Sequence, residues 1–276
     1  YLILPICLIQ AANFSGLMGS MTDITAMQAS GGISDNPLAA LGPSFALNYA
    51  GVIFFSCLGA LLMTSLIYAM VRLYNEREER LNGVVFGDIK SLLLRNIKRL
   101  FLMGIACSFL FIFAVIFIVL LAVLTPFTLI LTIPLLFAFM VPLALMAPIY
   151  LFEDISLGEA FAKTFRLGFA TWGGVFLVSL LMGIIANVLQ GVTMMPWYIA
   201  TVVKYFFAMS DVGGSGEVTV SAGYSFFLYL MAIIQTFGAY LAMIFTFVGM
   251  AYQYGHASEV VDSITVETDI DNFDKL

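Results

Sequence analysis

Long apolar runs, separated by shorter polar or charged segments, dominate the pattern of this chain. The longest run, from Leu100 to Phe152, contains no Asp, Glu, Lys, Arg or His. One crossing of a bilayer takes about 20 apolar residues, so this run is long enough for two. Because open strands cannot satisfy their backbone groups in lipid, the crossings are expected to be helices. The pattern therefore predicts an all-α, polytopic membrane protein.

The lengths of the runs predict six membrane-spanning helices. A turn at Thr125-Pro126 divides the longest run, and proline ends or kinks helices. The spans are expected over about 1–18, 45–71, 100–124, 127–151, 172–192 and 224–252. They form a single transmembrane domain, residues 1–252, followed by an acidic tail, residues 253–276. Since Tyr1 already lies in an apolar run, we expect the first span to be truncated and further residues to precede it.

Two segments beside the spans have the spacing of amphipathic helices. In 87–99, apolar residues recur at helical intervals between basic ones, and Asp88 is placed to cap the start. In 156–170, Ser156 and Glu159 form a capping box, and Glu159 and Lys163 are spaced as an i,i+4 ion pair. Leu157, Phe161 and Phe165 make an apolar stripe, and Trp172 follows as an interfacial anchor. Both segments are predicted to lie at the headgroup level of the membrane.

The basic residues set the orientation of the spans. Ten of the eleven Lys and Arg residues fall on one side of the predicted topology, and only Lys204 falls on the other. Cytoplasmic loops carry the excess of basic residues, so both termini are expected in the cytoplasm. Basic side chains on the two amphipathic segments are candidates for lipid-headgroup contact: Lys90, Arg95, Lys98, Arg99, Lys163 and Arg166.

Little catalytic chemistry can be read from the remaining residues. No charged residue lies deep in a predicted span, which argues against ion-coupled transport. The intramembrane amides usually join helices by hydrogen bonds, and the alternative is a substrate pathway; the candidates are Asn13, Asn187, Gln190 and Gln235. His256 stands alone, and the three cysteines lack metal-ligand spacing. We expect no catalytic residue, metal site or cofactor, and no binding of nucleic acid.

The C-terminal tail combines acidic and apolar residues. Six acids and one lysine give residues 252–276 a formal charge of −5, while the loop from Arg72 to Arg99 carries +3. One reading is a solvated tail. The other is that the tail binds the basic loop or a basic partner through Ile270, Phe273 and Leu276.

The segment from Ile155 to Leu167, followed by Trp172 and a span containing several glycines, resembles a broad group of bacterial inner-membrane proteins. The group includes the membrane domain fused to some glycerophosphoryl diester phosphodiesterases. The resemblance covers mainly 154–190 and the overall layout of helices. It implies a six-helix architecture in the bacterial inner membrane. The phosphodiesterase domain is absent from this chain, so the resemblance carries over no catalytic residue.

Three functions remain open at this stage. The first is a non-enzymatic accessory or scaffold subunit that organises membrane lipid, a membrane-protein partner or a homo-oligomer. The second is a transporter or lipid-handling permease, which would need a cavity lined by the intramembrane amides. The third is a membrane enzyme, for which Glu153-Asp154 is the only paired carboxylate beside a span, although helix capping explains that pair equally well. The sequence favours the first.

Overall fold

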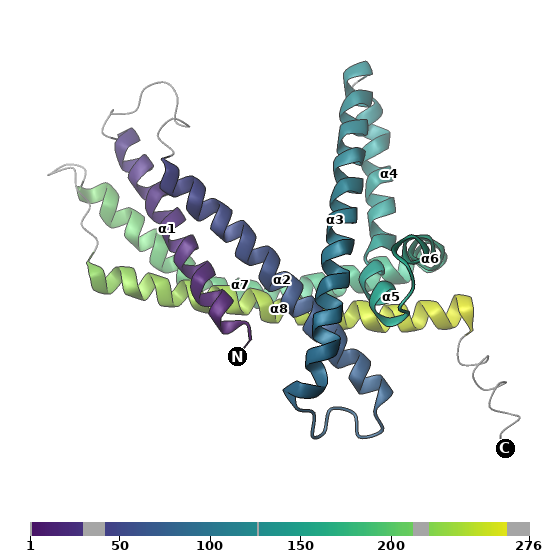
Figure 1. Cartoon of the computed structure of the whole chain (residues 1–276). Helices are drawn as coiled ribbons and strands as arrows, with labels where there is room; N and C mark the ends of the chain where they lie inside the picture. The colour runs from purple at the N-terminus through teal and green to yellow at the C-terminus, as the bar shows by residue number, and fades with distance from the viewer. Residues whose placement is uncertain (1, 30–41, 126, 212–220, 264–276) are drawn as a thin grey trace, which may run out of the picture. The chain divides into compact units, whose positions relative to one another are not determined.

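The computed structural model describes residues 2–29, 42–125, 127–211 and 221–263. Over these residues it is built from helices and contains no strand (Figure 1). The helices are α1 (Leu4–Ala29), α2 (Pro43–Glu76), α3 (Phe86–Leu124), α4 (Thr128–Leu143), α5 (Met146–Phe152), α6 (Leu157–Ala170), α7 (Trp172–Asp211) and α8 (Ala222–Asp262). Within the described part of the chain, six stretches are long and apolar enough to cross a membrane, with α4 and α5 together making the fourth. The predicted all-α, multi-pass membrane class is confirmed.

Several helices extend further than the sequence pattern indicated. Residues 87–99 do not form a separate surface helix, because α3 begins at Phe86 and continues without a break to Leu124. No proline or glycine lies between Arg95 and Met103 to interrupt it. Likewise, α7 continues beyond residue 192 to Asp211, and α8 beyond residue 252 to Asp262. The charged segments are thus partly extensions of the spans.

The chain divides into two compact units. Unit 1 comprises residues 1–63 and 185–243, and unit 2 comprises residues 64–184 and 244–276. The helices α2, α7 and α8 each contribute residues to both units. Each unit has its own buried cluster of side chains.

Unit 1 is joined by polar contacts between α1, α2 and α8. The side-chain amide of Gln10 donates to Ser56 Oγ at 2.7 Å, and the hydroxyl of Tyr240 donates to Gln10 Oε1 at 2.6 Å. The Tyr240 ring lies directly over Gly59, where a Cβ atom would collide with it. Trp197 packs on Phe14 with 4.9 Å between ring centroids. Small residues and amides therefore join the helices of this unit, as is usual in membranes.

Unit 2 is built around α5 and α6. Leu145, Ile149, Leu167 and Val175 are completely buried in its core. The lack of a side chain at Gly168 lets α6 approach Pro142 of α4 closely. This tight packing holds α6 against the end of α4.

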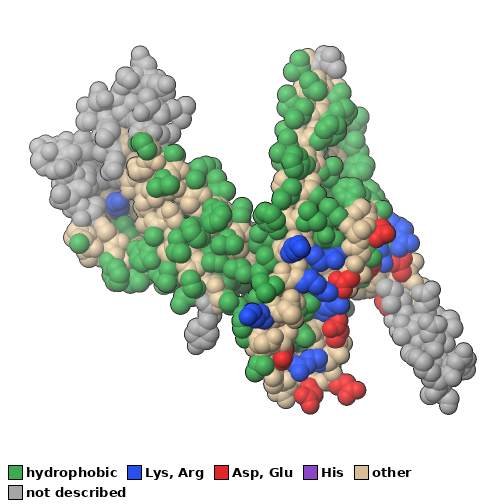
Figure 2. Space-filling model, viewed as in Figure 1, with side chains coloured by type: hydrophobic (Ala, Val, Ile, Leu, Met, Phe, Trp, Pro, Cys, Tyr) green, Lys and Arg blue, Asp and Glu red, His purple; other side chains and the backbone are tan. Residues whose placement is uncertain are grey.

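One helix pair of unit 2 is much less buried than its core. The helices α3 and α4 lie side by side as a hairpin (Figure 1), and large apolar side chains cover the visible face of that hairpin (Figure 2). Phe109 and Phe113 are each 70% exposed. Such a surface requires an apolar environment, which hydrocarbon or other membrane helices supply.

Candidate functional site

Charged side chains gather at one end of unit 2 (Figure 2), and most of them form ion pairs with one another. They come from the ends of α2, α3 and α8, from α6, and from the turn between α5 and α6. Ion pairs form two networks, which meet at the neighbouring residues Glu153 and Asp154 and which we together call the charged cluster: Arg72, Glu76, Arg95, Arg99 and Asp154 in the first, and Glu153, Lys163, Arg166 and Asp262 in the second. The cluster therefore ties five segments of the chain together.

Asp154 receives three of the five cations in the charged cluster. Its carboxylate lies 3.1 Å from Arg72, 3.1 Å from Arg95 and 3.8 Å from Arg99. Asp154 itself has a φ of +54°, a left-handed conformation that Asp and Asn tolerate better than most residues. The turn between α5 and α6 thus positions one carboxylate among three guanidinium groups.

The Arg99 side chain also binds backbone carbonyl groups on both sides of the turn. Its Nη2 donates to the carbonyl oxygens of Tyr150 and Ile155, each at 2.7 Å. The guanidinium carbon lies 4.0 Å from the centroid of the Tyr150 ring, a cation–π contact. Among the described residues, however, Arg99 Nε and Arg95 Nε and Nη2 are buried without a hydrogen-bond partner.

Lys163 and Glu153 form the second part of the charged cluster. Lys163 Nζ lies 2.8 Å from Glu153 and 2.9 Å from Asp262, and Arg166 lies 2.7 Å from Asp262. The Tyr254 hydroxyl donates to Glu153 Oε1 at 2.6 Å. Burial alone would lower the pKa of Lys163, but hydrogen bonds and charge attraction from Glu153 and Asp262 outweigh it and raise that pKa above its usual range. The lysine is therefore held in its charged form.

The predicted capping box of α6 is present, but the predicted ion pair is not. Ser156 N–H donates to Glu159 Oε2 at 3.0 Å, and Glu159 N–H donates to Ser156 Oγ at 3.4 Å. Because Glu159 is engaged there, Lys163 pairs with Glu153 and Asp262 instead. Glu153 and Asp154 likewise pair with cations and do not cap α6. Asp88 is not the N-cap residue of α3 as expected: Val85 is the N-cap, and Asp88, the third residue of the helix, accepts a hydrogen bond from Val85 N–H at 3.3 Å.

Trp172 is part of a helix–helix contact and is not simply an interfacial anchor. Its indole N–H donates to the carbonyl oxygen of Ala138 in α4 at 3.0 Å. In a regular helix that carbonyl would bond the N–H of residue 142, and Pro142 has none. The Trp172 side chain therefore satisfies the carbonyl that the proline leaves without its helical partner.

An apolar groove lies between α3, α4 and α6. Its volume is about 620 Å³, and its lining is almost entirely apolar, with Thr132 as the main polar residue. Phe161 and Phe165, the stripe predicted on α6, close one side of it. A smaller pocket of about 260 Å³ shares Cys107, Leu110 and Phe161 with the groove and reaches Leu157 and Gly158 in the first turn of α6.

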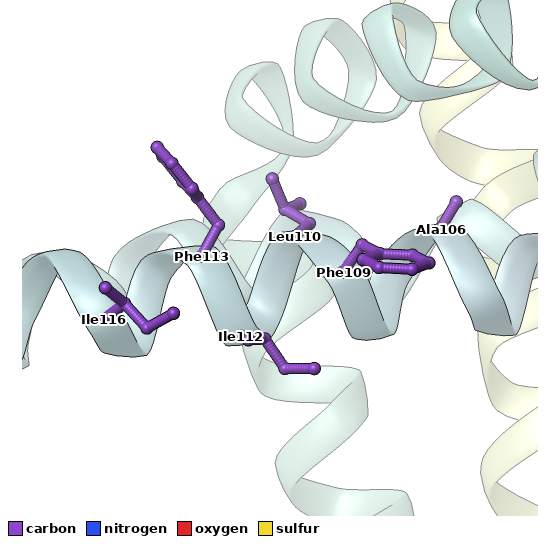
Figure 3. Close-up of a pocket in the computed structure, with 6 residues that line it drawn as sticks. All are labelled: Ala106, Phe109, Leu110, Ile112, Phe113 and Ile116. Carbon is purple, nitrogen blue, oxygen red and sulfur yellow. The ribbon is translucent and has the colours of Figure 1, made fainter.

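A third hollow, of about 530 Å³, lies along α3 alone. Figure 3 shows that its side chains come from one helix and point in different directions: Ala106, Phe109, Leu110, Ile112, Phe113 and Ile116. Residues on a single helix cannot enclose a ligand. This hollow is therefore part of the exposed apolar surface of the hairpin.

The predicted headgroup-contact residues separate into two groups. Arg95, Arg99, Lys163 and Arg166 belong to the charged cluster. Lys90 and Lys98 are exposed and make no ion pair with a described residue. Only these two resemble simple surface lysines.

The four predicted intramembrane amides lie in unit 1 and line none of the three hollows described above. Asn13 donates to the carbonyl of Ile9 at 2.9 Å and lies over Gly51 of α2. Asn187 and Gln190 are exposed. Gln235 has a buried Oε1 without a hydrogen-bond partner among the described residues.

The apolar tail residues Ile270, Phe273 and Leu276 lie outside the described residues. The described part of the acidic segment is helical, and Asp262 pairs with α6 instead of the Arg72–Arg99 loop.

Sequence reasoning missed the convergence on Asp154, because its three arginines lie 55 to 82 positions away. Among the residues searched, which are the described ones, no group of His, Cys, Asp and Glu could hold a metal ion. No family model, curated protein or solved structure matches the chain.

Proposed function

We propose that this chain is a non-enzymatic accessory or scaffold subunit of the bacterial inner membrane, with both termini in the cytoplasm. The observation that carries the proposal is the charged cluster, in which ion pairs join the ends of α2 and α3 to Asp154 in the turn before α6, and join α6 to Glu153 and to the end of α8. From this fixed base the α3–α4 hairpin presents a broad apolar surface. A rigid base with an exposed hairpin is suited to holding other membrane components in place.

The distribution of basic residues supports the proposed orientation of the spans, with both termini in the cytoplasm. Ten of eleven basic residues fall on one side of the six-span topology, and basic loops stay in the cytoplasm. The bacterial inner membrane is proposed from the resemblance expected for residues 154–190. In this arrangement the charged cluster lies at the cytoplasmic surface.

A partner would be a membrane protein or a second copy of the chain. The test is mild extraction of the intact protein from its own membrane, followed by the mass and composition of the particle. A stoichiometric protein partner or a homo-oligomer supports the proposal. A lone chain without any protein partner contradicts it.

A lipid-handling permease is the second candidate function, favoured by the apolar groove between α3, α4 and α6. A handling role requires movement of lipid between leaflets or membranes. Reconstituted vesicles carrying a fluorescent phospholipid would measure it. An unchanged transfer rate relative to protein-free vesicles would remove this candidate and leave the scaffold proposal intact.

A further inference from the structure

We propose that the groove between α3, α4 and α6 binds one phospholipid, with an acyl chain in the groove and the phosphate at Arg95 and Arg99. The inference rests on the proposed placement of the charged cluster at a membrane surface. It does not require a protein partner. It names a ligand for the groove, whereas the proposed function does not specify what binds there.

The groove has the length and lining of an acyl-chain site. Along α3 it extends from Cys107 to Ile118, about 16 Å at 1.5 Å per residue. One leaflet of hydrocarbon is about 15 Å thick, half of the bilayer core. Because the groove opens between two membrane-spanning helices, the medium that fills it is hydrocarbon. Its volume lies within the range of roughly 300–1,000 Å³ that is typical of ligand sites.

Positively charged side chains that could bind a phosphate lie beyond the end of the groove nearest the charged cluster. Arg99 lies seven residues before Ala106 of the smaller pocket, so the two share one face of α3 and are separated by about 10 Å. Arg99 also binds the carbonyl of Ile155, two residues before Leu157 in the lining of that pocket. The headgroup layer is roughly 5–8 Å thick on each side of the hydrocarbon, so a phosphate lies closest to Arg99, and Arg95 is one helical turn, about 6 Å, further along α3.

The charged cluster has cationic capacity to spare. It contains five cations and four anions, and Asp154 is shared by three guanidinium groups. Three N–H groups on Arg95 and Arg99 lack a hydrogen-bond partner among the described residues. The Arg95 side chain as a whole is 39% exposed, whereas its unpartnered Nε and Nη2 are buried, so a phosphate engages them only after the side chain turns outward. Guanidinium groups bind phosphate by paired, charge-assisted hydrogen bonds.

The first experiment fills the groove without altering the charged cluster. Ala114→Phe places a ring in the groove, and the matched control Val119→Phe adds a ring to an exposed position on the same helix. Native mass spectrometry of the full chain in mild detergent measures retained phospholipid. We expect about one per chain in the unmodified protein and the control, and a clear loss in Ala114→Phe. Equal retention in both variants would overturn the proposal.

The second experiment tests the phosphate. The chain is placed in phosphatidylcholine vesicles containing phosphatidylglycerol or diacylglycerol with the same diazirine-bearing acyl chain. After illumination, cross-links are mapped by peptide mass. Cross-links from phosphatidylglycerol should fall on 107–118 and 132–143, and those from diacylglycerol should be about tenfold weaker there, as expected for losing a charge-assisted hydrogen bond.

Two results of this mapping would overturn the proposal. Equal labelling by both probes means that the phosphate is not recognised. Labelling spread evenly over all faces of α3 means ordinary lipid contact. Either result leaves the accessory function untouched, because that function is judged by protein partners in the extracted particle.

Discussion

Asp154 carries more ion pairs than any other described acid in unit 2, and its backbone conformation makes it a sensitive position. Replacement by Asn keeps the size of the side chain and tolerates the left-handed φ, so it removes only the charge. Three arginines then lose their shared acceptor. Since these groups are partly exposed, we expect Asp154→Asn to lower the free energy of unfolding by about 1–2 kcal/mol. Thermal unfolding in mild detergent measures the change.

The control for Asp154→Asn is Arg77→Gln. Arg77 pairs with Asp88 at 3.6 Å, and both side chains are well exposed. An exposed pair contributes about 0–1 kcal/mol, so this variant should unfold close to the unmodified protein. If the two variants unfold alike, Asp154 is not the centre of the cluster.

Trp172 and Pro142 make a second prediction at the scale of single residues. Trp172→Phe removes the donor to the Ala138 carbonyl and should cost about 1–3 kcal/mol, because a partly buried acceptor is left unpaired. Pro142→Ala restores an N–H at the position that normally bonds this carbonyl. In a Pro142→Ala background, Trp172→Phe should therefore cost much less. A double-mutant cycle of unfolding free energies measures the coupling, and additive effects would refute it.

At the scale of elements, the start of α6 depends on its capping box. Hydrogen bonds from Ser156 lower the pKa of the Glu159 carboxyl below its ordinary value near 4.5. The stability that Glu159 contributes is therefore fully present above pH 4.5 and is lost as the pH falls through the lowered pKa. Glu159→Gln should unfold more easily than the unmodified protein at pH 7, and the two should converge at lower pH.

Ser156→Ala tests the other half of the same cap. Loss of an N-cap hydroxyl costs about 1 kcal/mol, with no dependence on pH of its own. Unfolding measured from pH 3 to pH 8 separates the two variants. A constant difference between Glu159→Gln and the unmodified protein across this range would show that the carboxylate is not the capping group.

The elements also show how far the sequence pattern reaches. Six apolar helices and the Ser156–Glu159 cap follow from local spacing, because each depends on residues within a few positions. The partner of Lys163 does not, since local spacing offers Glu159 while the fold offers Glu153 and Asp262. The separate surface helix at 87–99 was wrong for a related reason. Amphipathic spacing identifies a face, but it does not mark where a helix ends without a breaking residue.

At the scale of the whole molecule, the orientation of the spans is the prediction most easily tested. Replacing Cys7, Cys57 and Cys107 gives a background for single cysteines at Glu78 or Ser221, both of which are exposed. A membrane-impermeant maleimide applied to intact cells should label Ser221→Cys and leave Glu78→Cys unlabelled until the membrane is opened. The reverse pattern would invert the topology, and labelling of both would contradict the six-span arrangement.

The division into units has a consequence for the order in which the molecule is made. Residues 64–184 of unit 2 emerge from the ribosome as one uninterrupted segment, whereas unit 1 joins residues 1–63 to residues 185–243. At the usual pace of protein synthesis, the first part of unit 1 waits roughly 10–40 s in the membrane for the second. During that interval Gln10 has Ser56 beside it but lacks Tyr240. Insertion factors that shelter polar groups in the bilayer would act on α1 and α2 during this wait.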